Sequence, residues 1–154
     1  MTPAEITQIE SHLNLSLPQE YRDAILSHPL PDSSSYNYEF CGHYETLLAE
    51  NNLIRDNGFF DHDWNSALFI IGFDGCGNKY FITTSPFDGR IYFADHEEDF
   101  DLVALTKNEY YESFSEFNEF LIEVEDDIRL SEEELEVSIK NRKWWQFWIP
   151  KPIK

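Results

Sequence analysis

The sequence predicts an α+β domain in which helices flank a mainly antiparallel sheet. Three observations lead to this class. Apolar residues recur at steps of three and four near both ends of the chain, which is the period of a helix packed on one face. Short apolar runs separated by glycine-containing turns occupy the middle, as in an antiparallel meander. With 154 residues, 42% of them hydrophobic and 16% aromatic, the chain can bury a core without disulfide bonds.

Two helices are predicted at the N-terminal end. Thr2 and Glu5 form a capping box around a proline at the first helical position, and this helix should end near Asn14. A second helix should begin within residues 17–21, where Pro18 suits a first helical turn. Its inward stripe should be Tyr21 with Ile25 or Leu26.

Residues 27–58 predict a loop, a short strand and a helix. Residues 27–35 contain two prolines and three consecutive serines, which do not continue a helix. Residues 36–40 alternate aromatic with polar side chains, as a strand does. Residues 45–57 predict a helix that Gly58 ends.

The middle of the chain predicts an antiparallel meander. Residues 68–73, 79–84 and 90–94 are apolar strands, joined by turns at 74–78 and 86–89. Because side chains alternate along a strand, one alternating set should face a helix. The residues that we expect in adjacent antiparallel strands are Phe69, Ile71, Tyr80, Ile82, Ile91 and Phe93.

The glycine-rich segment 74–78 is interpreted as a hairpin turn. It joins two strands, whereas a phosphate-binding loop leads into a helix N-terminus and usually carries a Lys followed by Ser or Thr. It also lacks the alternating acidic ligands and final Glu of an EF-hand. Gly75 and Gly77 supply the positive φ angles that such turns need.

Two more helices are predicted at the C-terminal end. Ser131 and Glu134 form a second capping box, with Leu130 and Leu135 as a hydrophobic staple, so a separate last helix should run to about Asn141. No repeat or linker divides the chain, and we expect one domain with a core over about 5–128 and a C-terminal helix and tail over 131–154. The helix before it should be capped by Ser113 or Ser115, and its inward stripe should be Phe114, Phe117, Leu121, Val124 and Ile128.

Charge is the most unusual global property. The formal net charge is −19, and residues 1–139 hold 30 acidic and six basic side chains, a charge of −24. Such a body repels phosphate backbones and anionic membranes and attracts basic proteins, so we expect a basic protein partner, no nucleic acid and no membrane. The plainer alternative is that the acids only maintain solubility.

Localisation is predicted to be cytoplasmic. The start shows no signal-peptide pattern, and no apolar run approaches the roughly 18 residues of a membrane span. Cys41 and Cys76 lack CxxC spacing and are expected to be reduced thiols.

Two acidic segments are candidate partner contacts. Residues 95–101 follow a strand and carry five acids, which suits either a solvated loop or a docking surface. Residues 61–63, Asp-His-Asp, suggest a metal, but neighbours on an extended chain point in opposite directions and cannot hold one ion. We find no catalytic set and expect no catalytic residues, no metal and no cofactor. The candidate partner-binding residues are Asp61, Asp63, Asp95, Glu97, Glu98, Asp99, Asp101, Trp144 and Trp148.

The tail, residues 140–154, combines five basic residues with three tryptophans and no acid. It could suit nucleic acid, a membrane surface or a protein groove. Nucleic acid would have to approach a strongly negative body, so the simpler interpretation is that the tail packs on its own acidic domain. At least two of its large aromatic side chains should then be buried against the body or another copy.

Taken together, three segments resemble the SUKH superfamily, also called the Smi/Knr-like family. They are 6–21, a helix leading into Leu-Pro-x-x-Tyr; 69–83, with Ile-Gly-Phe-Asp-Gly-x-Gly-Asn before an aromatic strand; and 90–95, Arg-Ile-Tyr-Phe-Ala-Asp. The later Ser-Phe-x-x-Phe at 113–117 also fits, and the likeness spans about residues 5–125. The turn at 27–31 departs from the family pattern, which has a small turn with glycine there.

The resemblance implies an α+β domain with a mainly antiparallel sheet and no catalytic residues. Bacterial members look like immunity proteins, which bind and neutralise a cognate toxin, often a nuclease, while a fungal relative regulates cell-wall synthesis. The leading hypothesis is therefore an immunity protein whose acidic surface covers the basic face of a toxin. The alternatives are a regulatory or scaffolding module of the cell-wall-regulator type, and an enzyme whose site is assembled from separate loops.

Overall fold

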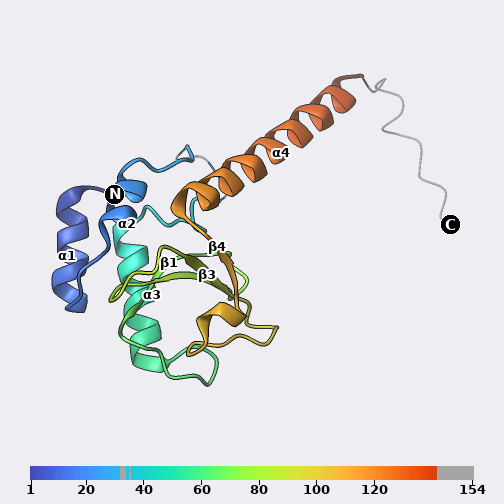
Figure 1. The fold of residues 1–154 in the computed structure, drawn as a ribbon. Coiled ribbons are helices and arrows are strands. Elements are labelled where there is room, and N and C mark those ends of the chain that lie inside the picture. The colour runs from blue at the N-terminus through green and yellow to red at the C-terminus, as the bar shows by residue number, and fades with distance from the viewer. Residues whose placement is uncertain (32–33, 35, 142–154) are drawn as a thin grey trace.

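The computed structural model describes residues 1–31, 34 and 36–141. Side chains are described only as far as residue 137. Within these ranges the chain forms four α-helices, a short 3-10 helix and one four-stranded sheet, so the predicted α+β class is confirmed (Figure 1). The helices are α1 (Pro3–Leu13), α2 (Gln19–Leu26), α3 (Tyr44–Asn57), η1 (Leu105–Lys107) and α4 (Phe114–Asn141). The strands are β1 (Leu68–Phe73), β2 (Lys79–Thr83), β3 (Ile91–Ala94) and β4 (Glu109–Tyr111).

The first two helices begin and end close to their predicted positions. The Thr2 hydroxyl accepts a hydrogen bond from the Glu5 amide at 3.3 Å, and the Glu5 carboxylate accepts one from the Thr2 amide at 2.7 Å, which completes the capping box. Asn14, with φ 52°, ends α1 in the left-handed conformation. Pro18 is the N-cap of α2 instead of a helical residue, and Tyr21 is fully buried as predicted.

The sheet is a meander in which each strand pairs antiparallel with the next, in the order β1-β2-β3-β4. This confirms the pairing predicted for the first three strands. β4 was not predicted, because it has only three residues, and its pairing of Tyr111 with Ile91 depends on a distant part of the chain. A β-bulge at Ile71 places two β1 residues, Ile71 and Gly72, opposite Tyr80 of β2.

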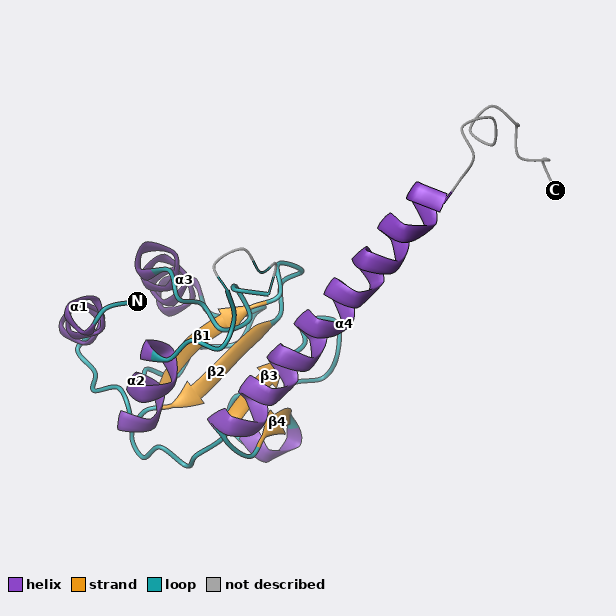
Figure 2. Cartoon of the chain, turned by 90° about the horizontal axis from the view of Figure 1, so that it is seen from above, coloured by secondary structure: helices purple, strands orange, loops and turns teal. Residues whose placement is uncertain are grey.

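Both faces of the sheet are covered, which explains why its strands contain nearly continuous apolar runs. One face contacts α1, α2 and α4, and Figure 2 shows α4 crossing on the side of β3 and β4. The other face packs against Ile54 of α3 and the loops that contain Phe59 and Leu102. From the predicted alternating set, the buried members on the first face are Phe69, Ile71, Tyr80, Ile82 and Ile91, with Phe93 partly buried beside them.

The segment 36–41 forms a turn, so the strand predicted over 36–40 is wrong. The Glu39 amide donates to the Tyr36 carbonyl, which bends the chain back on itself. The bent segment still makes two backbone hydrogen bonds to β1, from Phe73 N to Tyr38 O and from Cys41 N to Ile71 O, both at 2.8 Å. It therefore covers the outer edge of β1 without forming a ladder.

The C-terminal end forms one helix, so the predicted break at Ser131 is wrong. The Ser131 hydroxyl donates to the Ile128 carbonyl instead of capping a new helix, and Arg129 joins the two halves by ion pairs with Asp126 and Glu133. No glycine or proline interrupts residues 113–141, so a Ser-x-x-Glu pattern alone cannot stop the helix. The predicted staple is also absent, because Leu130 and Leu135 are 51% and 61% exposed.

No helix within the described ranges has both the length and the apolar character needed to cross a bilayer. For α4 the reason is plain from its sequence, since residues 123–136 contain eight acidic side chains.

Glu39 provides a test of the packing at the β1 edge. Its side chain is 8% exposed, one carboxyl oxygen has no hydrogen-bond partner among the described residues, and burial raises its pKa to about 6. A raised carboxyl pKa means that the fold favours the protonated form, so the contribution of Glu39 to stability is greatest below pH 4.5 and is lost as the pH rises through 6.

Glu39→Gln should therefore raise the free energy of unfolding by up to about 2 kcal/mol at pH 8, and this gain should shrink by more than half at pH 5. Urea denaturation at pH 5, 6, 7 and 8 measures the difference. Glu123→Gln, at an exposed position of α4, is the control and should leave the pH profile unchanged. A gain for Glu39→Gln that is the same at every pH would contradict the assignment.

Candidate functional site

The loop after α3 and the loop after β3 lie against each other, although more than thirty residues separate them in the sequence. The Phe60 ring stacks on His96 with centroids 4.9 Å apart, and the His62 ring contacts Phe100 at 4.7 Å. These two loops carry the two acidic segments that the sequence identified separately. The structure therefore brings both sets of candidate carboxylates to one region of the surface.

The loop after α3 is shaped by a tight reversal of the backbone. Gly58, with φ 76°, ends α3, and a Cβ there would lie 2.5 Å from the His62 carbonyl oxygen, so the turn needs a glycine. Phe59 and His62 exchange backbone hydrogen bonds at 2.9 and 3.0 Å. Between them, Phe60 and Asp61 adopt positive φ angles of 44° and 67°. An aromatic residue in this conformation is unusual, and such outliers are concentrated at functional sites.

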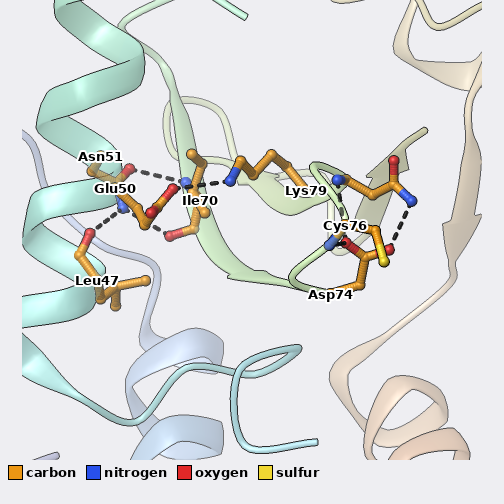
Figure 3. Close-up of polar contacts among 8 residues, drawn as sticks. Leu47, Glu50, Asn51, Ile70, Asp74, Cys76 and Lys79 are labelled. Atoms are coloured by element: carbon orange, nitrogen blue, oxygen red, sulfur yellow. Dashed lines mark hydrogen bonds and ion pairs between the residues drawn. The ribbon is translucent and has the colours of Figure 1, made fainter. Parts of the chain in front are cut away.

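The loop after β3 is held by the hairpin turn between β1 and β2. The Asp74 carboxylate accepts hydrogen bonds from the amides of Cys76 and Asn78, which closes the predicted turn (Figure 3). The Asn78 side-chain oxygen accepts from the His96 amide at 2.9 Å and lies 2.7 Å from His96 Nδ1, which places the ring proton on Nδ1. Gly77 leaves room for this ring, since a Cβ there would lie 2.9 Å from Nδ1.

The candidate carboxylates of the second loop differ in what they do. Glu97, Glu98 and Asp99 are exposed, whereas Asp95 accepts a hydrogen bond from the Glu97 amide at 2.8 Å. Asp101 is committed to the loop itself.

The Asp101 carboxylate accepts hydrogen bonds from the amides of Ala104 and Val103 and pairs with Lys107 at 2.9 Å. The Ala104 amide and the other two contacts lower the pKa of Asp101 to about 2. Its role in folding the loop explains its position, and a charge reversal there would disturb the loop.

Two exposed apolar side chains of this region, one on α3 and one in the loop after it, share a pocket. Leu53 of α3 and Phe60 are 58% and 53% exposed, and they line a shallow pocket of about 240 Å³. Lys79 at its edge is neutralised by Glu50, with Nζ 2.9 Å from the carboxylate (Figure 3). We call this region the acidic–aromatic surface. It consists of Leu53, Phe60, Asp61, Asp63, Asp95, Glu97, Glu98 and Asp99.

Three predicted contacts are not assigned to this surface, and two contributors were missed. Trp144 and Trp148 lie outside the described residues, and Asp101 serves the loop. Leu53 and Phe60 were not predicted. The available signal was the Phe-Phe pair directly after Gly58, because a turn there buries one ring and leaves the other exposed.

The chemistry available at this surface is recognition of positive charge and apolar area. Within the part of the chain that the structure describes, no group of three or more His, Cys, Asp or Glu side chains is arranged to hold a metal ion. His96 Nδ1 lies 4.0 Å from an Asp95 oxygen, and its closer partner is Asn78. Carboxylates around an exposed ring bind guanidinium and ammonium groups by charge-assisted hydrogen bonds and by cation–π contact.

The comparisons with known proteins identify a family. The model of the SMI1 / KNR4 family (SUKH-1) matches residues 1–123. This span contains α1 to β4, the first turns of α4 and both loops of the acidic–aromatic surface. No curated protein and no solved structure matches the chain.

Proposed function

The chain belongs to the SMI1/KNR4 family (SUKH-1), and on that basis we propose that it is a non-enzymatic protein-binding domain that acts as a cytoplasmic immunity protein and neutralises a cognate bacterial toxin. The toxin would present a basic face, as a nuclease does where it binds phosphate. The acidic–aromatic surface is the contact through which we propose that this occurs.

The observation that carries this proposal is that two loops in contact with each other bear six carboxylates, and that two exposed apolar side chains lie on one of these loops and on the adjoining helix α3. Interfaces commonly have an apolar centre with aromatic anchors and a polar rim. We propose Leu53 and Phe60 as the apolar centre and the exposed carboxylates of the two loops as the rim. Complementary charge mainly accelerates capture, while the apolar centre mainly slows dissociation.

The partner can be sought in the neighbouring gene, where a large secreted protein with a toxin-like C-terminal domain is expected. Association of the two purified proteins should slow by about tenfold or more between 0.1 and 1 M salt, as the Debye length falls from about 10 to 3 Å. The absence of a neighbouring toxin gene would favour the regulatory alternative over the immunity function.

The surface itself is tested by charge reversal at Glu97, Glu98 and Asp99. Changing all three to Lys should lower the association rate by about tenfold or more and weaken protection of cells from the toxin. The fold should be retained, because exposed charges contribute little to stability. The matched control reverses three exposed carboxylates on other elements, Glu20, Glu45 and Glu119, and should change the association rate by less than about threefold.

The apolar centre needs a separate variant. Phe60→Ala should raise the dissociation rate by roughly tenfold or more, whereas Leu26→Ala, at a 46% exposed position of α2, should leave it unchanged. Equal effects of the surface and control variants would show that this surface is not part of the interface.

A further inference from the structure

The second half of α4 extends away from the body of the molecule, as both Figure 1 and Figure 2 show. Phe117 and Leu121 are fully buried against the sheet, and Val124 and Ile128 are half-buried. Glu125 accepts a hydrogen bond from Ser34. Among the described residues, this is the hydrogen bond between α4 and the body that lies farthest along the helix. Beyond it, Leu130, Leu135 and Val137 are 51%, 61% and 56% exposed.

The composition of this extension gives it low stability as an isolated helix. Residues 122–137 carry eight acidic side chains and one basic residue, Arg129, a formal charge of −7. Like charges three and four residues apart destabilise a helix, and the two exposed ion pairs of Arg129 contribute only a few tenths of a kcal/mol each. A helical stretch of about 15 residues is marginal in water without packing. The extension therefore needs a cover that is both basic and apolar.

The chain supplies a segment with this chemistry directly after α4. Residues 142–154 contain Arg142 and three lysines, no acid, and the aromatic residues Trp144, Trp145, Phe147 and Trp148. We propose that residues 142–154 fold back, within the same chain, onto the second half of α4. The basic groups would pair with the α4 carboxylates, and the aromatic rings would cover its exposed apolar side chains.

The reach of the segment and its tethering favour the same chain over a second copy. Fully extended, residues 142–154 span at most about 45 Å, whereas the helix from residue 126 to 141 is about 24 Å long. The segment can therefore lie along the whole extension. A short tether also gives a local concentration in the millimolar range, which exceeds that of a second molecule in solution. This proposal concerns a different surface from the one proposed for the toxin, and neither depends on the other.

Tryptophan fluorescence tests the proposal on the full-length chain. Three of the four tryptophans are in residues 142–154, and Trp64→Phe removes the fourth, so all tryptophan emission then comes from the tail. In the folded protein this emission should be blue-shifted and several-fold less accessible to acrylamide than in urea. The emission wavelength and the quenching should both be independent of protein concentration. Light scattering should give the mass of a monomer.

The variant that tests α4 replaces Leu130, Leu135 and Val137 with Gln, which keeps helix propensity and removes the apolar contacts. In the Trp64→Phe background, acrylamide should quench the tryptophan emission of this triple variant almost as strongly as it does in urea. The matched control makes the same change at three apolar residues that are exposed elsewhere, and it should leave the quenching low. The control residues are Leu26, Leu53 and Val103.

Three results would overturn the proposal. Quenching in the folded protein equal to that in urea would show an uncovered tail. Protection that survives the α4 variant would place the tail on another surface. Protection that rises with concentration, together with a dimeric mass, would assign the tail to a second copy of the chain.

Discussion

Gly72→Ala should lower the free energy of unfolding by about 3 to 5 kcal/mol, because the backbone of the neighbouring turn occupies the space of the new side chain. A Cβ at this position would lie 1.8 Å from the Glu39 carbonyl oxygen and 2.6 Å from the Tyr38 carbonyl oxygen. Both obstacles are backbone atoms, so no change of rotamer relieves the clash.

The hydrogen bonds beside Gly72 hold the turn in place. Phe73 N donates to Tyr38 O and Cys41 N donates to Ile71 O, so the turn is fixed over Gly72 from both sides. Making room for a methyl group requires breaking one or both bonds and displacing Phe40, which is fully buried.

Thermal unfolding measures the effect, and a loss of this size corresponds to roughly 8 to 16 °C in Tm for a chain of this length. Gly42→Ala is the control, because its Cβ would meet the His28 ring at an ordinary 3.6 Å and should cost less than about 1 kcal/mol. Similar melting temperatures for the two variants would show that a side chain at position 72 does not displace the turn. If Gly72→Ala does not fold in buffer alone, comparing Gly72→Ala with Gly42→Ala in the presence of a stabilising osmolyte gives the same ranking.

Asn51→Leu should cost about 2 to 4 kcal/mol, because one amide side chain satisfies both backbone groups of Ile70 at the edge of the sheet. Asn51 is fully buried on α3, its Nδ2 donates to Ile70 O at 2.9 Å, and its Oδ1 accepts from Ile70 N at 3.0 Å (Figure 3). Leucine has nearly the same size but leaves a buried donor and a buried acceptor without partners.

The control for this variant is Asn57→Leu on the same helix. Both asparagines donate Nδ2 to the carbonyl four residues earlier at 3.0 Å, but Asn57 is exposed and has no described bond to the sheet. Asn57→Leu should change the free energy of unfolding by less than about 0.5 kcal/mol in urea denaturation. Equal effects of the two changes would assign the cost to the helical bond and not to the edge of β1.

The features of the fold that could be predicted depend on residues close together in the chain. The capping box of Thr2 and Glu5, the turn of residues 74–78 and the end of α3 at Gly58 each involve groups within five positions of one another. The alternation along β1 and β2 and the stripe of Phe117 and Leu121 on α4 also repeat over short distances. Local sterics and hydrogen bonds decide such features, so the sequence expresses them directly.

The errors occurred where a local pattern competes with a distant contact. The alternation at 36–40 resembles a strand, but this segment forms a turn that packs against the backbone of β1 at Gly72. The Ser-x-x-Glu pattern at Ser131 resembles a cap, yet uninterrupted helix formers and the ion pairs of Arg129 continue α4 through it. β4 has too few residues to carry a pattern and forms because β3 presents an open edge.

The candidate site shows the same division. By itself, the sequence determined that the chain is an acidic α+β protein, and it located two runs of carboxylates on loops. Only the tertiary structure decided that these loops meet, that Leu53 and Phe60 are exposed beside one pocket, and that Asp101 holds its own loop. The physical reason is that charge and periodicity are properties of neighbouring residues, whereas a surface is made by ring contacts such as that of Phe60 with His96, whose partners are far apart in the chain.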